Sequence, residues 1–318
     1  MSSLNIPGLK VGHATDAAHQ TGCTVFLCPE GTVGSVDVRG PAPGSHETAL
    51  LQPDKPIHHI NGLVFTGGSA FGMATVDGVM RYLGERGIGH KTPIRPIPIV
   101  SAAVVYDLFF SRENPPTAEM GYAACLAACE DDIPQGNVGA GTGVTVGKWG
   151  GFDNVIMKGG FGFAGETIDG VVVSAAAVTN AIGDVVNADG TVLAGSKTST
   201  GTWLVEQNPY RIFRSGPPTQ LGTNTTLVVV ATNAKLDGVE ANRLAQRAHD
   251  GMAIAIRPVH TTHDGDIAFS LATGQVEANF DLVANVGVAV VAEAIRNSVR
   301  FAETVGQAVG LASGNSNR

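Results

Sequence analysis

The stretch Gly222-Thr-Asn-Thr-Thr-Leu-Val-Val-Val-Ala-Thr232 decides the fold, because it marks the sharpest change of pattern in the sequence. The residues before it, 195–224, include Gly-Ser-Thr and Pro-Pro segments without an apolar period, which predicts an exposed, poorly ordered connection. Residues 225–232 form the most β-prone run of the chain and predict a buried strand. We therefore expect a central strand that begins at Thr225, directly after an exposed loop.

Outward from this strand, short apolar runs closed by Gly, Pro or Ser predict further strands, and apolar spacing of three or four residues predicts helices. The expected strands lie at residues 24–28, 62–66, 98–101, 143–148, 170–176, 184–186, 191–193 and 266–271. The expected helices lie at residues 69–83, 118–129, 236–256 and 281–305. Two blocks of strands with helices between and after them predict two stacked sheets with helical outer layers in one domain, 1–318.

Composition narrows the class of protein. The 318 residues are 43% hydrophobic and 15% charged, which is enough apolar surface for a packed core. The net charge is −8 and no basic run is present, which disfavours nucleic-acid binding. The amino-terminal residues lack the apolar segment of a secretory signal, and the apolar stretch 282–292 is too short to span a bilayer. We expect a cytoplasmic protein whose four cysteines are small buried hydrophobes.

Thr225 allows two interpretations. A threonine at the mouth of a strand is ordinary, because β-branched residues favour strands. The alternative is an N-terminal nucleophile: if the chain cleaves itself between Asn224 and Thr225, the new α-amine can serve as the general base for the Thr225 hydroxyl. Spacing alone does not choose among Thr223, Thr225 and Thr226.

The downstream stretch His260-Thr-Thr-His-Asp-Gly-Asp266 contains two histidines and two carboxylates. As a metal motif it has H-x-x-H spacing in a loop, unlike the helical H-E-x-x-H pattern of zinc peptidases. Asp264 and Asp266 lie two residues apart, so in an extended chain they point to the same side. We expect them to orient the amine or hydroxyl of a nucleophile, with no metal and no cofactor.

A set of motifs, taken in order, carries a family resemblance. The motifs are Gly8-Leu-Lys-Val-Gly-His-Ala-Thr15, Thr21-Gly-Cys-Thr-Val25, Val36-Asp-Val-Arg-Gly40, Thr66-Gly-Gly-Ser-Ala-Phe-Gly72, Gly139-Ala-Gly-Thr-Gly143, Asn180-Ala-Ile-Gly-Asp184, Asn224-Thr-Thr226 and Asp264-Gly-Asp266. Together they resemble the L-aminopeptidase/D-alanine-esterase family of self-processing hydrolases, which includes β-aminopeptidases and nylon-oligomer endohydrolases. The resemblance covers about residues 6–305 and is nearest to the nylon-oligomer branch.

The resemblance implies a four-layer αββα sandwich of the N-terminal-nucleophile-hydrolase type. It also implies autocleavage between Asn224 and Thr225 into an α chain, 1–224, and a β chain, 225–318, that stay associated. The family assembles as multimers of such αβ units, so we expect a homo-oligomer, in the form of a tetramer. The substrate would be a small-molecule or short-peptide amide.

Six site residues follow from the resemblance. Thr225 would be the nucleophile, with Asp264 and Asp266 orienting its amine and hydroxyl. Asn180 would offer a side-chain N–H to the oxyanion, and Lys148 and Tyr106 would supply further donors. The same three residues have plainer interpretations: Asn180 as a turn residue, Lys148 as a solvated strand end and Tyr106 as a packed core phenol.

One departure bears on the substrate. The β-aminopeptidase branch has a glutamate two residues before its tyrosine, and this sequence has Val104 there. An apolar residue cannot pair an ammonium group, which favours amides such as 6-aminohexanoate oligomers, cleaved internally. The alternatives are a β-aminopeptidase or D-amino-acid esterase-amidase, an acyltransferase of the ornithine-acetyltransferase type, and a cleaved but inactive binding protein.

Overall fold

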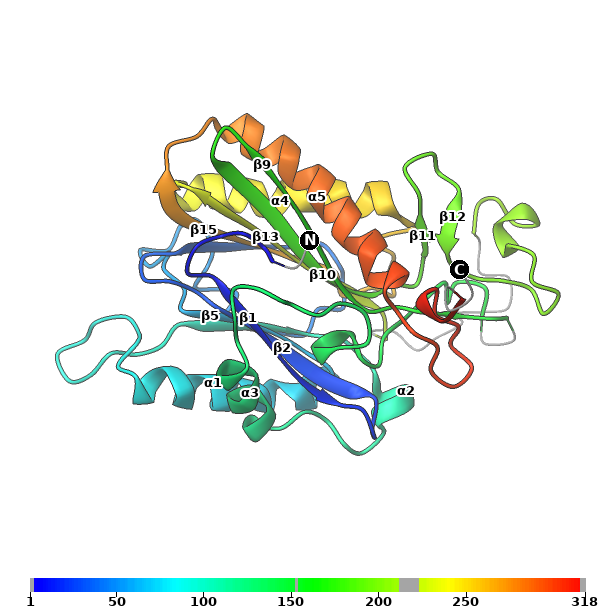
Figure 1. The fold of residues 1–318 in the computed structure, drawn as a ribbon, viewed down its shortest axis with the longest axis horizontal. Coiled ribbons are helices and arrows are strands. Elements are labelled where there is room, and N and C mark those ends of the chain that lie inside the picture. Colours follow the sequence, from blue (N-terminus) through cyan, green and yellow to red (C-terminus); the bar gives the residue numbers. More distant parts are fainter. Residues whose placement is uncertain (1–2, 152–153, 212–222, 315–318) are drawn as a thin grey trace.

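Two five-stranded sheets lie face to face, with a pair of helices on the outside of each (Figure 1). The computed structural model describes residues 3–151, 154–211 and 223–314. The first sheet has the order β1-β2-β5-β6-β4 and is covered by α1 and α3, while the second has the order β3-β15-β13-β10-β9 and is covered by α4 and α5. The expected αββα sandwich is confirmed.

The bounds of the elements follow. The first sheet contains β1 (Lys10–Asp16), β2 (Thr21–Leu27), β5 (Gly62–Thr66), β6 (Val100–Val104) and β4 (Ser45–His46). The second contains β3 (Val33–Val38), β15 (Ile267–Val276), β13 (Thr225–Ala234), β10 (Val171–Asn180) and β9 (Phe161–Ile168). The helices are α1 (Ala74–Glu85), α2 (Leu108–Ser111), α3 (Ala118–Leu126), α4 (Gly238–Ala255) and α5 (Phe280–Arg300). Two small sheets have the orders β12 (Val192–Ala194)-β11 (Asp184–Val186)-β14 (Ile256–Arg257) and β7 (Thr145–Val146)-β8 (Met157–Lys158).

Strand β13 is the central strand that the sequence predicts, and all ten of its residues are buried. Its side chains alternate between two cores: Leu227 and Val229 face the core between the sheets, while Val228 and Val230 face the core under α4 and α5. Strand β10 pairs with it antiparallel and β15 pairs with it parallel. A parallel pair needs a crossover connection, which α4 supplies.

The two long helices are set by their caps. Asp237 and Glu240 form a capping box at the start of α4, and Asn279 caps α5 through its side chain. Helix α5 ends at Arg300, five residues before the expected end, because Val305 bonds to Ala308 in a turn instead. Helix α5 is long and apolar enough to cross a membrane by length and composition, but 61% of its apolar window is buried inside the protein.

The expectation of an exposed, poorly ordered connection at residues 195–224 holds only in part where the structure describes them: residues 199–201 and 206–207 are exposed, but other residues are tied into the fold. Ser196 is buried, and its backbone N–H donates to a carboxylate oxygen of Asp184 over 2.9 Å. Arg211 pairs with the other oxygen of the same carboxylate at 2.8 Å. These polar contacts order the segment without any apolar period, so hydrophobic patterning missed it. The remaining part, 212–222, lies outside the described residues.

Smaller differences concern element ends and the cysteines. The expected strand at 143–148 is only Thr145–Val146, and the helix expected from residue 69 starts with a 3₁₀ turn, Ser69–Met73, before α1. Strand β10 runs on to Asn180, four residues beyond the expected end. Cys23 and Cys125 are buried as expected, whereas Cys129 is exposed.

Candidate active site

Thr225 is the first residue of β13, and its position opposite Asn180 is fixed by the pairing of β13 with β10. The Thr225 hydroxyl donates a hydrogen bond to the carbonyl oxygen of Asn224 over 2.6 Å. The backbone N–H of Gly265 donates to the same oxygen over 2.8 Å. The carbonyl of the 224–225 peptide bond is therefore polarised by two donors, one of which belongs to the candidate nucleophile.

Asp264 and Asp266 flank this carbonyl from the loop that leads into β15. Both are almost completely buried, at 2% and 1% exposure. Asp266 accepts the backbone N–H of Thr226 over 2.6 Å, so it holds the residue after the candidate nucleophile. Asp264 accepts the N–H and the hydroxyl of Thr261. Burial, with a smaller contribution from the Asp266 charge, raises the pKa of Asp264 to about 6.

Asn180 connects three parts of the site through one side-chain amide. Its oxygen accepts Lys148 Nζ at 2.8 Å and the backbone N–H of Thr145 at 3.1 Å. These two donors fix which end of the amide is oxygen and leave the nitrogen as the donor. That nitrogen donates to the backbone carbonyls of Tyr106 and Thr223, at 3.1 and 3.2 Å. The expected oxyanion donor is thus bonded to the chain just before the 224–225 bond.

Lys148 is buried at 2% exposure and also donates to the Asn180 backbone carbonyl at 3.0 Å. Burial lowers the pKa of Lys148 to about 7, against a smaller opposing effect of the Asp264 charge. The interpretation of Lys148 as a solvated strand end is therefore wrong. A lysine in this state donates hydrogen bonds in both of its protonation states near neutral pH.

Tyr106 joins the site through its backbone carbonyl, which accepts the Asn180 amide. Its half-buried ring packs edge-on against Phe109, with ring centroids 5.2 Å apart. The resemblance implies a donor role for the phenol. In the structure the contact to Asn180 comes from the main chain.

The two histidines of the downstream motif have separate contacts. His260 bonds to Asp266 through its ring, while the backbone carbonyl of His263 accepts the Asn224 side chain at 3.4 Å. Among the described residues, no group of three or more His, Cys, Asp and Glu side chains is arranged to hold a metal ion. In the structure these two histidines contact Asp266 and Asn224, respectively.

Sequence reasoning missed three contributors. Gly265 lies inside the Asp-Gly-Asp motif, but its donor is a backbone N–H. The residue type therefore does not indicate this donor. The short spacing between His260 and Asp266 in the sequence could have suggested that their side chains are in contact. His249 lies on α4 and contacts the ring of His260 at 3.2 Å. Nothing in the helical pattern distinguishes His249 from an ordinary core residue.

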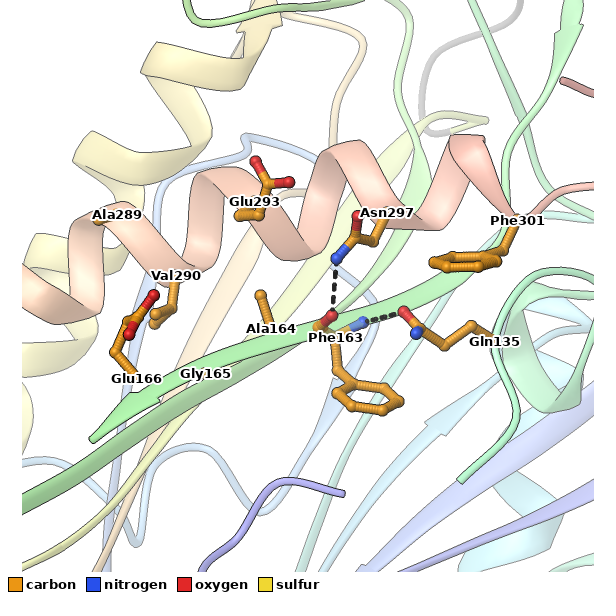
Figure 2. Close-up of a pocket in the computed structure, with 10 residues that line it drawn as sticks. All are labelled: Gln135, Phe163, Ala164, Gly165, Glu166, Ala289, Val290, Glu293, Asn297 and Phe301. Atoms are coloured by element: carbon orange, nitrogen blue, oxygen red, sulfur yellow. Dashed lines mark hydrogen bonds between the residues drawn. The ribbon is translucent and has the colours of Figure 1, made fainter. Parts of the chain in front are cut away.

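A surface pocket of about 420 Å³ between β9 and α5 lies among residues that contribute nothing to this group (Figure 2). Within it, the backbone of Phe163 is bonded on both sides: its N–H donates to Gln135 and its carbonyl accepts from Asn297. These contacts satisfy the outer edge of the sheet at Phe163 and place no nucleophile in the pocket. The chemistry-bearing side chains converge at Thr225.

Comparisons with known proteins find a peptidase family and several relatives. The sequence profile of peptidase family S58 matches residues 4–312. An uncharacterized aminopeptidase of Mycobacterium leprae is 38% identical over 309 residues, covering 87% of this chain and 80% of that protein. A 6-aminohexanoate-oligomer endohydrolase of Paenarthrobacter ureafaciens is 32% identical over 287 residues, covering 87% of this chain and 76% of that protein.

Solved structures show the same fold. The L-aminopeptidase D-Ala-esterase/amidase of Ochrobactrum anthropi, described as a variant of the N-terminal-nucleophile-hydrolase fold, superposes with a TM-score of 0.74 at 21% identity. The match covers 96% of this chain and 87% of that one. A β-aminopeptidase of Burkholderia sp. superposes with a TM-score of 0.68 at 20% identity, covering 96% and 88%.

Proposed function

We propose, from the premise that the chain belongs to peptidase family S58 and hydrolyses amide bonds, that Thr225 is its N-terminal nucleophile. The observation that carries this proposal is the position of the Thr225 hydroxyl, 2.6 Å from the carbonyl oxygen of Asn224. The Gly265 N–H on the same oxygen is placed to stabilise the negative charge that develops there during attack. A hydroxyl beside the bond and a donor on its carbonyl oxygen together support the proposal of self-cleavage.

Cleavage proceeds by transfer of an acyl group. The Thr225 oxygen attacks the Asn224 carbonyl carbon, its proton passes to the departing nitrogen, and the chain becomes an ester at Thr225. Water hydrolyses this ester and releases Asn224 as a carboxylate. The products are residues 1–224 and 225–318, and Thr225 gains a free amine whose ordinary pKa is about 7.7–8.0.

Turnover repeats the same chemistry on a substrate. The neutral Thr225 amine takes the hydroxyl proton, and the oxygen attacks an amide carbonyl. The proton passes to the departing substrate amine as the C–N bond breaks, and water hydrolyses the resulting ester to release the acid and restore the hydroxyl. When the cleaved end moves away, the Asn180 amide loses Thr223 as its partner and can donate to the substrate oxyanion. Lys148 and the Thr145 N–H hold that amide in the donating orientation. Activity should rise with pH as the Thr225 amine loses its proton.

The two segments have a structural reason to stay together. Strand β13 follows the cut and pairs along eight residues with β10, which precedes it. Strand β15 pairs in the same way with β3. We therefore propose an αβ unit that persists after cleavage. We also propose that this unit is cytoplasmic and assembles as a tetramer. Light scattering of the purified protein tests the tetramer.

Mass spectrometry of the purified protein tests the nucleophile. Scaling the 32.6 kDa mass by length gives pieces of about 23 and about 9.6 kDa, the smaller beginning Thr-Thr-Leu. Thr225→Ala should stay at full length and be inactive. Thr226→Val and Thr223→Val are matched controls that remove a neighbouring hydroxyl and should still be cut. An intact wild-type chain that turns over amides would refute the proposal.

For the substrate, we propose aliphatic oligoamides such as 6-aminohexanoate oligomers, in line with the names of the relatives at 31–32% identity. Val104 is buried at the end of β6 against Gly44, and it offers no partner for a substrate ammonium. The test uses one oligoamide with its amine free and the same compound with its amine acylated. Similar kcat/KM values for both support internal cleavage.

An aminopeptidase is the second candidate, and the names of the mycobacterial relatives at 38–40% identity favour it. Activity confined to the free-amine oligoamide would select it. Transfer of the acyl group to an added amine in place of water would instead identify an acyltransferase.

A further inference from the structure

Asp266 is held on both of its carboxylate oxygens. One oxygen accepts the Thr226 N–H, and the other accepts the backbone N–H of His260 at 3.1 Å and its ring Nδ1 at 2.7 Å. His260 can grip one oxygen with two donors because its backbone is left-handed, with φ of 54°. This conformation is uncommon for a residue other than glycine and is strained unless the surroundings impose it.

The hydrogen bonds continue from His260 into α4, and their direction is fixed. His249 Nε2 faces two acceptors of Asp37, the backbone carbonyl at 3.1 Å and a carboxylate oxygen at 3.4 Å, so Nε2 carries a hydrogen. Burial lowers the pKa of His249 to about 4, and its neutral ring therefore accepts at Nδ1. His260 Nε2, 3.2 Å away, must then donate to it.

The direction of this hydrogen bond determines the protonation of the His260–Asp266 pair. Since His260 donates through Nε2 to His249, a hydrogen bond at Nδ1 requires a second proton shared with the Asp266 carboxylate. The pair thus has no net charge. The other charged groups near it are Asp37 with its partner Arg39 at the outer end, and Asp264 and Lys148 at the inner end.

We propose that His260, oriented by His249, is the positioning residue that holds Asp266 in place for the nucleophile. The inference rests on the proposed function and concerns the state after cleavage. Thr225 is then a chain end that has lost its covalent link to Asn224. It keeps its pairing position opposite Asn180, and the next anchor along its strand is the Thr226 N–H on Asp266. If the Asp266 carboxylate could rotate, Thr225 could move away from its reactive position. Small displacements of a nucleophile lower the rate by large factors.

Two substitutions distinguish the contribution of the His260 ring from that of the His260 backbone N–H. His260→Asn keeps a side-chain nitrogen near the Nδ1 position and tolerates a positive φ, whereas His260→Gly keeps only the backbone N–H and relieves the strain. The fraction cleaved is measured by mass spectrometry, kcat and KM are measured per cleaved molecule, and Tm is measured for each variant. We expect His260→Gly to lower kcat about 10- to 100-fold with KM little changed, and His260→Asn to recover most of the loss.

The ¹⁵N NMR spectrum of histidine-labelled enzyme gives a readout that a purely structural role would not move. With the His260 signals assigned from their absence in His260→Asn, both ring nitrogens should be protonated at neutral pH. A ring with one proton, or a His260→Gly enzyme with kcat within about twofold of wild type, overturns the proposal. The proposal is also overturned if both variants lose kcat equally and this loss parallels a fall in Tm. These results are independent of the mass spectrometry of wild type and Thr225→Ala, which tests the proposed function.

Discussion

Two buried lysines lie around the β7–β8 hairpin and have opposite uses. Lys148 follows β7 and Lys158 ends β8; both are almost completely buried, and burial lowers the pKa of each to about 7. Lys148 donates to both oxygens of Asn180, which pairs with Thr225. Lys158 donates to three backbone carbonyls, those of Gly141, Val144 and Gly159.

The difference shows that burial and a shifted pKa do not identify a catalytic lysine, although shifted groups gather at active sites. What separates the two is the partner. An amide side chain can change its own partner if the chain is cut, so Lys148 holds a group that takes part in the proposed reaction. Backbone carbonyls stay where they are, so Lys158 ties three segments together.

The largest expected effect is the loss of activity in Lys148→Met. Without its lysine the Asn180 amide is free to turn, and loss of one oriented oxyanion donor costs about 10²- to 10³-fold in kcat. Stability at pH 8 should not fall, because the Asn180 side-chain oxygen keeps the Thr145 N–H and the cost of burying Lys148 is removed. Kinetics on cleaved enzyme together with Tm at pH 8 test this; a large fall in Tm with intact kcat would reverse the assignment.

Lys158→Met should show the opposite pattern. Three buried carbonyls lose a donor, so the free energy of unfolding of Lys158→Met at pH 8 should lie about 2 kcal/mol below that of Lys148→Met, which removes a similar burial cost. The kcat of the folded, cleaved enzyme should stay within a few-fold of wild type. Urea unfolding and kinetics on the same preparation provide the measurement. A Lys158→Met enzyme as inactive as Lys148→Met would erase the distinction between the two lysines.

The pH dependence of stability should report both lysines together. Their folded pKa values of about 7 lie below the ordinary value of 10.5. Between these limits the unfolded chain binds more protons, so the free energy of unfolding rises with pH, by at most about 1.4 kcal/mol per unit for each lysine. Urea unfolding of Thr225→Ala, which stays uncut, from pH 7 to 9 tests this. Each Lys→Met change should flatten the rise.

The smallest effect concerns Asp264, whose charge opposes the shift at Lys148. Its pKa is raised to about 6 in the folded protein, so its contribution to stability is present below about pH 4 and lost as the pH rises through 6. Asp264→Asn does not titrate. Its free energy of unfolding should match that of the otherwise identical protein with Asp264 near pH 4 and exceed it by about 2 kcal/mol at pH 8. A gain that grows toward acid pH would contradict the shift.

The sequence carried much of the fold because apolar patterning records burial directly. Strand β13 and its start at Thr225 could be predicted from one run of β-branched residues. The packed segment 195–211 could not, because Asp184 orders it from a distance through Ser196 and Arg211. Polar contacts of this kind leave no period in the sequence.

The candidate site divides in the same way. Thr225 and the two aspartates stand in short motifs, and the resemblance supplied Asn180, Lys148 and Tyr106. No motif marks Lys158 or His249, since each owes its role to atoms of distant segments. The Gly265 donor belongs to the main chain, where any residue type has an N–H.

The contact between the Asn224 carbonyl and the Gly265 N–H has a practical consequence. These atoms meet only after β13, α4 and β15 have come together, so the proposed cleavage would take place only in chains that have folded. The cut would then be a permanent record that a molecule once reached its native arrangement. In a variant that keeps its nucleophile and donors, the ratio of uncut to cut chain on a denaturing gel would give the fraction of molecules that never folded, and the protein would report its own folding yield.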